Sequence, residues 1–235
     1  MFMRIFTGLL VSLIILESQL FGQIEPRAIL DKVQEKYDAI EDYKVKINLK
    51  VDIPNFRMPN KNMQVYYKKP DKVKVETSGF AVLPRFGLVP TPAIFLNDSA
   101  RATYLRSFRE GSTLYHVIAI SRAQFDQNRA DVFLRINANR WTIDRATIED
   151  RQEGTTEVNI TYKNIDGFWL PDTTRIEFNL KRSIPPVERP NVNQPFGGKE
   201  RYTAEDDQPV KGYMTIIFSK FIVNRGIKDW IFKEE

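Results

Sequence analysis

The sequence predicts a mainly β chain of the α+β class, built on a large antiparallel sheet with one apolar and one polar face. Three observations predict it. Aliphatic and polar residues alternate strictly over Val45–Ile53, short strand-like runs recur at near-regular spacing, and one helical period precedes them. Such a series of short strands indicates a meander, as in a barrel or half-barrel. The apolar face needs a cover, and the identity of that cover is the functional question.

The first residues have the pattern of an export signal. Arg4 supplies a basic region, and Ile5–Leu16 is an apolar stretch shorter than the roughly 20 residues that span a bilayer. Gly22 is a small residue suited to cleavage. We therefore expect a signal peptide over residues 1–22, cleaved near Gly22, followed by one exported domain over residues 23–235. The alternative is an uncleaved anchor.

A helical period follows over Ile24–Ile40. Pro26 stands where the first turn of a helix tolerates proline, and the apolar residues fall on or near one stripe. We expect this amphipathic helix to lie against the apolar face of the sheet. The stripe consists of Ala28, Leu30, Val33, Tyr37 and Ile40.

The strands begin with Val45–Ile53, in which every odd position is aliphatic. A second alternating run ends in a turn at Lys69–Lys72 and continues beyond it, which predicts a hairpin. Later strands are predicted over Leu114–Ile120, Val132–Ile136, Trp141–Ile148, Glu157–Tyr162, Thr173–Leu180 and Tyr213–Val223.

Two segments break the strand pattern. Gly79–Leu96 is apolar, with a single charge at Arg85 and prolines at positions 84, 90 and 92, which rule out a continuous central strand or a long helix. It is either a loop that plugs its own core or a hydrophobic lid that uncovers an apolar cavity. Ser183–Lys211 is rich in proline and glycine, and we expect it to be a long exposed loop.

Composition excludes several kinds of chemistry. The chain has no cysteine, so disulfides, thiol nucleophiles and a lipid-modified cysteine of its own are excluded. His116 is the only histidine, and a lone histidine on an alternating strand is typical of a surface or cross-strand residue. We expect no catalytic residue, no metal and no cofactor. A carboxylate-based hydrolase is a remote alternative, because Glu149-Asp150 and Asp206-Asp207 are neighbours that nothing holds across a cleft.

The net charge of +5 arises from lysines and arginines scattered among nearly as many acids, largely on strand faces. This favours a solvated sheet face over a nucleic-acid surface, and acidic lipid headgroups remain possible partners.

Three stretches carry a resemblance to a known family. The first is Met63–Val75, after an exported helix and an alternating strand; the second is Gly167–Pro171, which leads into Thr174–Phe178; the third is Phe221–Phe232. The first resembles the start of the LolA family, the periplasmic carriers that ferry lipid-modified proteins to the outer membrane. The second is similar to the C-terminal half of that family, and the third is similar to the endings of its more distant members. The resemblance spans most of the chain that follows the signal.

This resemblance implies an open antiparallel β half-barrel whose concave apolar face is closed by the helix and an apolar lid, with acyl chains held inside. It also implies a periplasmic monomer with an inner-membrane donor and an outer-membrane acceptor. Lys69 matches the basic residue, usually arginine, that ties down the lid in the family. Lysine lacks the planar fork of arginine, so we expect a weaker latch.

We therefore expect a non-catalytic carrier of acylated lipoproteins or other lipids, since each buried methylene stabilises the complex by about 0.8 kcal/mol. The alternatives are a lipid-sensing interaction module of the same fold and a filled β core without ligand. The expected lining residues from the sheet are Ile47, Leu49, Val65, Tyr67, Val73 and Val75. Those expected from the lid are Phe80, Leu83, Phe86, Leu88, Ile94 and Phe95.

Overall fold

A computed structural model of the chain describes residues 25–54, 58–78, 100–122, 131–150, 154–180 and 210–233. The described part contains one α-helix, α2 (Pro26–Asp38), ten strands and a short 3₁₀ helix, η3 (Asp229–Phe232). The strands are β1 (Asp42–Asp52), β2 (Lys61–Lys68), β3 (Lys72–Thr77), β4 (Ala100–Glu110), β5 (Thr113–Arg122), β6 (Asp131–Asn137), β7 (Thr142–Asp150), β8 (Gly154–Ile165), β9 (Phe168–Leu180) and β10 (Val210–Val223). No helix among these residues is long and apolar enough to cross a bilayer.

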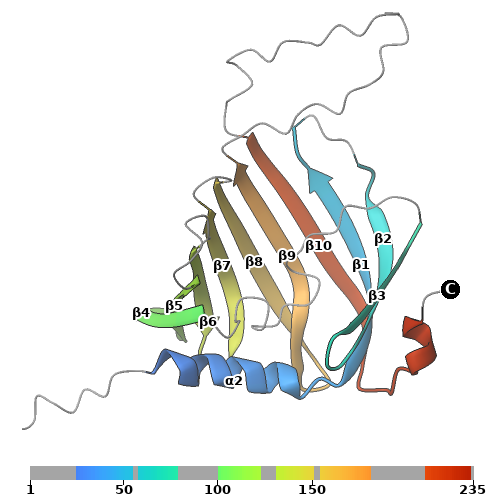
Figure 1. The fold of residues 1–235 in the computed structure, drawn as a ribbon, viewed down its shortest axis with the longest axis horizontal. Coiled ribbons are helices and arrows are strands. Elements are labelled where there is room, and N and C mark those ends of the chain that lie inside the picture. The colour runs from blue at the N-terminus through green and yellow to red at the C-terminus, as the bar shows by residue number, and fades with distance from the viewer. Residues whose placement is uncertain are drawn as a thin grey trace, which may run out of the picture.

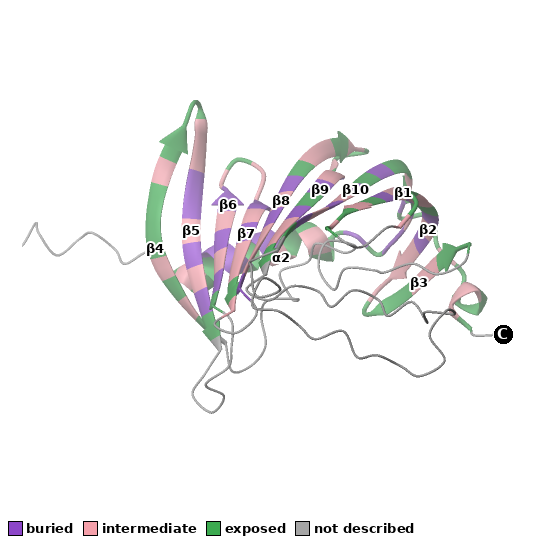
Figure 2. Cartoon of the chain, turned by 90° about the horizontal axis from the view of Figure 1, so that it is seen from above, coloured by how far each residue is buried: buried purple, intermediate pink, exposed green. Residues whose placement is uncertain are grey.

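All ten strands form one antiparallel sheet in the order β3-β2-β1-β10-β9-β8-β7-β6-β5-β4. Strands next to each other in the sequence are neighbours in the sheet, with the exception of β3 and β4. The pairing of β1 with β10 joins the opening strands β1 to β3 to the later meander. β3 and β4 are the two edges of this described sheet. Figure 2 shows the sheet curving into an arc around α2, so the predicted open half-barrel is confirmed.

Helix α2 lies across one end of the strands and contacts β4 and β7 (Figure 1). Its buried residues are Ile29, Leu30 and Val33, and they belong to the same core as the sheet. The predicted stripe is wrong at Ala28, which is exposed. Ile29 takes that place because positions 29, 33 and 37 follow one another by four residues along one side of a helix.

The structure confirms the predicted strands, with longer bounds for several of them. β8 and β9 extend to meet at the turn of Asp166 and Gly167, and Pro171 lies inside β9 where the pairing register with β8 shifts. Proline is tolerated in a sheet at such an irregularity. β10 begins at Val210, so the predicted loop Ser183–Lys211 runs two residues too far, and its other residues lie outside the described part.

The sequence prediction missed β4 (Ala100–Glu110). Among the β4 side chains that the structure describes none is buried, because the strand is an edge of the sheet. The register with β5 also shifts between Tyr104 and Arg106, and such a bulge breaks the alternation that identifies a strand. The strand therefore has neither the apolar content nor the period that the prediction used.

One corner of the molecule joins α2, β1 and the end of β10. The buried Asp42 carboxylate accepts hydrogen bonds from the backbone N–H groups of Arg225, Gly226 and Ile227, at 3.1, 3.0 and 3.2 Å. Asn224 Oδ1 accepts one from Glu41 N at 2.8 Å, and Asn224 Nδ2 donates one to the carbonyl O of Ala39 at 3.0 Å. These bonds fix the C-terminal segment against the start of the sheet.

Candidate functional site

The concave side of the sheet carries an aliphatic surface that continues across the strands, and we name it the inner face. One cross-strand row shows its character: Leu49, Ile216 and Ile160 flank a single polar residue, Thr174. All four are buried. The buried inner-face residues on these and the flanking strands are Val45, Ile47, Leu49, Met63, Val65, Met214, Ile216, Phe218, Ile176, Val158, Ile160, Ala146, Leu134, Val132, Ile118 and Ile120.

The structure brings the six predicted sheet residues together on this inner face. Ile47, Leu49 and Val65 are buried within it, at the centre of β1 and β2. Tyr67 and Val75 are half-buried, and Val73 is 46% exposed at the β3 edge. The predicted face is therefore buried in the middle of these strands and partly exposed to solvent at the β3 edge.

The prediction named only a third of the sheet. The inner-face residues of β5 to β10 were missed, although the alternation that would have found them is present in β9. In β10 both sides of the strand are apolar, so period alone could not orient it. The structure points Met214, Ile216 and Phe218 inward, and Ile217 outward.

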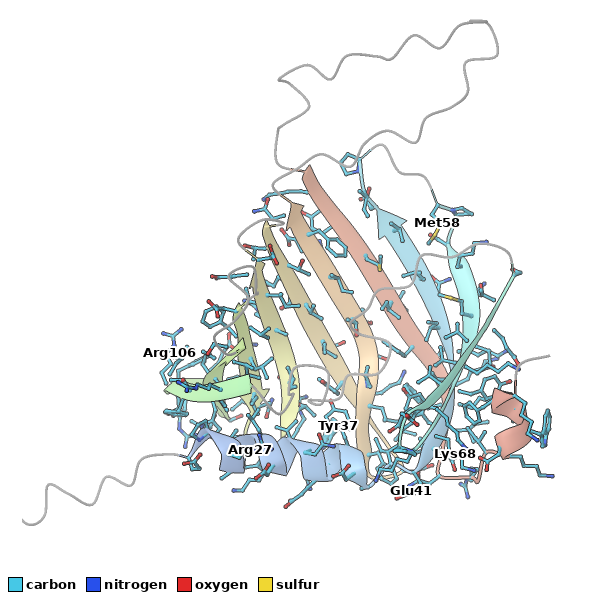
Figure 3. The ribbon with its side chains drawn as sticks, viewed as in Figure 1. Arg27, Tyr37, Glu41, Met58, Lys68 and Arg106 are labelled. Carbon is cyan, nitrogen blue, oxygen red and sulfur yellow. The ribbon has the colours of Figure 1, made fainter. Side chains whose placement is uncertain are left out.

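The six predicted lid residues, Phe80, Leu83, Phe86, Leu88, Ile94 and Phe95, lie outside the described residues. Lys69 is described, and its contacts are with the end of α2. Lys69 Nζ donates a hydrogen bond to the carbonyl O of Asp38 and lies 3.5 Å from Glu41 Oε1. Lys69 thus ties the β2–β3 turn to the C-terminal end of the helix, near the labelled Glu41 in Figure 3.

Aromatic residues gather where α2 meets the inner face. Tyr37 of the helix points toward the sheet in Figure 3, and its hydroxyl lies 3.3 Å from that of Tyr162. Tyr162 in turn donates to the carbonyl O of Ile143 at 2.8 Å. Burial raises the pKa of both phenols, so they stay neutral and act only as hydrogen-bond partners at ordinary pH.

His116 lies in the same region, between the rings of Trp141 and Tyr104, at centroid distances of 6.0 and 6.1 Å. It is buried, and its Nδ1 has no hydrogen-bond partner in the described part of the chain. Burial, reinforced by the nearby Lys32 ammonium, lowers the pKa of His116 below its ordinary value of 6.5. The histidine is a cross-strand residue, one of the two places predicted for it, and it is held neutral in the interior.

We expect the free energy of unfolding to decrease as the pH falls below about 6.5. At such a pH His116 is protonated in the unfolded chain but stays neutral in the folded chain, because its pKa is lower there. The loss is complete once the pH passes the lowered pKa, and each unit of lowering corresponds to about 1.4 kcal/mol. Urea unfolding between about pH 7.5 and pH 5 measures it. Phenylalanine at this position keeps the ring contacts, so His116→Phe should flatten the profile, and an unchanged slope would contradict the assignment.

The described residues contain no group of three or more histidine, aspartate or glutamate side chains placed to hold a metal ion. What the arrangement offers chemically is a broad aliphatic surface with tyrosine hydroxyls at one end. Such a surface fits hydrocarbon better than any polar ligand.

Comparison with solved structures finds similar folds. A LolA superfamily protein from Nitrosomonas europaea matches with a TM-score of 0.57 at 14% identity, over 90% of this chain and 99% of its own. A domain named for outer membrane lipoprotein sorting, from Vibrio parahaemolyticus, matches with a TM-score of 0.56 at 10% identity, over 88% and 97%. A DUF1329 family protein from Desulfovibrio piger matches with a TM-score of 0.55 at 12% identity, over 88% and 97%.

A scan against protein-family models and a search of curated proteins found no match to this sequence. The likeness is therefore one of fold, at identities too low to carry function, and it extends over nearly the whole length of the matched structures. Together with the unclosed ten-stranded sheet and the helix across its concave side, it establishes that the chain has a LolA-like fold.

Proposed function

We propose that this protein is a non-catalytic carrier that holds the acyl chains of lipoproteins, or of other lipids, against its inner face. The observation that carries the proposal is the largely aliphatic inner face of a sheet whose edges, β3 and β4, stay apart. In a closed barrel of this composition, the inward-facing residues would form only a hydrophobic core. An open one can expose the same surface to a ligand and bury it again afterwards.

The energetics agree with this proposal. Each methylene removed from water contributes about 0.8 kcal/mol, so a few acyl chains supply enough free energy for tight binding if the surface opposite is equally apolar. The β2–β3 edge is the natural point of entry, since Tyr67, Val73 and Val75 are the inner-face positions there that remain partly accessible.

The lid also belongs to this proposal. β3 and β4, which the chain connects through the apolar segment Gly79–Leu96, are opposite edges of the sheet. A connection between opposite edges is suited to covering the inner face. Lys69, which contacts the end of α2, lies in the turn before β3, at the opposite end of that strand from the one that this segment follows. The proposed setting is the periplasm, with a donor at the inner membrane and an acceptor at the outer membrane.

Native mass spectrometry with lipid extraction tests the carrier. The chain, purified gently from a cell envelope, should carry an acylated protein or a phospholipid. Val75→Asp places a carboxylate on the accessible part of the inner face and should weaken retention at least about tenfold, since that corresponds to only about 1.4 kcal/mol. Thr215→Asp is the matched control, because it adds the same charge at a half-buried position on the outward side of β10.

Three outcomes separate the possibilities. Bound lipid that passes to an acceptor supports the carrier. Bound lipid that stays, while the affinity for a protein partner changes, makes the same face a sensor. If the native mass spectrum shows only the ligand-free chain, and the protein takes up no fluorescent acyl probe, the inner face is an ordinary core and the proposal is overturned.

A further inference from the structure

The outer face of β1 and β3, on the other side of the sheet from the inner face, carries lysines that have no acidic partner. Among the described residues, no carboxylate lies within ion-pair distance of Lys46, Lys50 or Lys74. In the middle of the sheet, by contrast, arginines are paired: Arg145 lies 3.5 Å from Glu157, and Arg135 lies 3.3 Å from Glu110. This flank therefore carries uncompensated positive charge, as does the edge strand β4, whose exposed Arg101, Arg106 and Arg109 also have no ion pair among the described residues.

The pairing register places these lysines beside apolar groups. A cross-strand row on this outer face runs from Lys74 through Tyr66 and Lys44 to Ile222 of β10. Lys44 Nζ lies 5.2 Å from the centre of the Tyr66 ring. Ile222, at the end of the row, is 49% exposed.

The C-terminal 3₁₀ helix η3 adds an aromatic group to the same flank. Asp229 accepts a hydrogen bond from Lys68 Nζ at 2.8 Å and lies 3.2 Å from Lys72 Nζ. Both lysines project from the outer face, since their strand neighbours Tyr67 and Val73 belong to the inner one. η3 therefore packs against β3, as Figure 1 shows, and it holds Trp230 with 66% of its surface exposed.

We propose that this flank, formed by Lys44, Lys46, Lys50, Lys74, Ile222 and Trp230, docks the protein on the surface of an anionic phospholipid bilayer. Lysines that lack acidic partners attract anionic headgroups, each worth a several-fold gain in affinity. Tryptophan is suited to the boundary between headgroups and acyl chains, because its ring is apolar and its N–H can stay hydrated. The exposed Ile222, on β10 of the same outer face, gains by leaving water.

A bilayer explains both properties of the flank. A nucleic-acid duplex would use the lysines, but it would leave Ile222 and the Trp230 ring in water, and a single strand could stack on Trp230 but would leave Ile222 in water. An acidic protein partner would need a complementary apolar patch as well, whereas any anionic bilayer offers charge and hydrocarbon together. The proposal does not depend on a ligand on the inner face, because the two faces are on opposite sides of the sheet.

Vesicle flotation tests it with the full chain. Vesicles of phosphatidylcholine mixed with phosphatidylglycerol should bind the protein, pure phosphatidylcholine should bind it far less, and added salt should weaken binding. The triple variant Lys46→Gln, Lys50→Gln, Lys74→Gln should bind roughly 100-fold more weakly. The control triple, Lys36→Gln, Arg101→Gln, Arg109→Gln, removes equal charge from α2 and from the opposite edge strand β4, and it should bind like the parent.

Brominated lipids test the place of contact. They should quench part of the tryptophan fluorescence of the bound chain, and Trp230→Phe should abolish that part, since Trp141 and Trp169 lie elsewhere in the fold. Equal binding to neutral and anionic vesicles, or equal losses in the two triple variants, would overturn the proposal. If the protein retains lipid in native mass spectra but does not bind vesicles, the docking proposal is overturned and the carrier proposal stands.

Discussion

Asp42→Ala should lower the free energy of unfolding by about 3 kcal/mol, one of the largest effects expected for a single substitution in this chain. The carboxylate is 4% exposed and accepts the backbone N–H groups of Arg225, Gly226 and Ile227. Alanine leaves these three donors without their charged acceptor at a half-buried corner of the molecule. Charge-assisted bonds of this kind are roughly twice as strong as neutral ones.

Urea unfolding monitored by circular dichroism measures the loss. Asp52→Ala is the matched control, since Asp52 ends the same strand at an exposed position and should change stability by less than about 0.5 kcal/mol. The C-terminal segment should also become sensitive to protease in Asp42→Ala. Equal stabilities of the two variants would mean that the Asp42 bonds do not hold the segment in solution.

This corner illustrates what the sequence could not predict. Asp42 and Asn224 are 182 residues apart, and nothing in either local pattern points to the other. The alternation predicts strand β1 only from Val45, so Asp42 lies outside the predicted element. Partners so far apart are found only once the sheet order places β1 beside β10.

The strands themselves were predictable where one face of the strand is buried and the other is exposed to solvent. β1 and the β2–β3 hairpin alternate cleanly because each contributes a row to the inner face. β4 could not be found in this way, since its bulge and its exposed arginines remove the period. The sequence thus predicts the core rows of a sheet better than its edges.

The candidate site was predicted in kind but not in extent. Its sheet residues were placed on β1 to β3, and the structure adds the inner rows of the other strands. A curved sheet gathers residues from its whole width, whereas alternation in one strand shows only that strand. His116 was predicted to be a surface or cross-strand residue. Its position beside Trp141 and Lys32 of α2 could not be predicted, because local pattern does not bring these residues together.

Leu49→Ala should cost about 2–5 kcal/mol of unfolding free energy in the ligand-free protein, because Leu49 is fully buried on the inner face and alanine leaves a cavity there. If acyl chains bind this face, a long-chain lipid can fill that cavity. We therefore expect lipid to stabilise Leu49→Ala by more than it stabilises the parent. The stabilisation reaches about 2.7 kcal/mol when the free lipid is at 100 times its dissociation constant.

Asp42→Ala is the control for this comparison, since it weakens the fold at the opposite end of β1 and leaves the inner face intact. Lipid should stabilise it by the same amount as the parent. A larger gain in Leu49→Ala alone therefore places the lipid at Leu49, because general destabilisation would raise the gain in both variants. Lipid that leaves the unfolding free energy of all three proteins unchanged would show that the inner face serves only as a core.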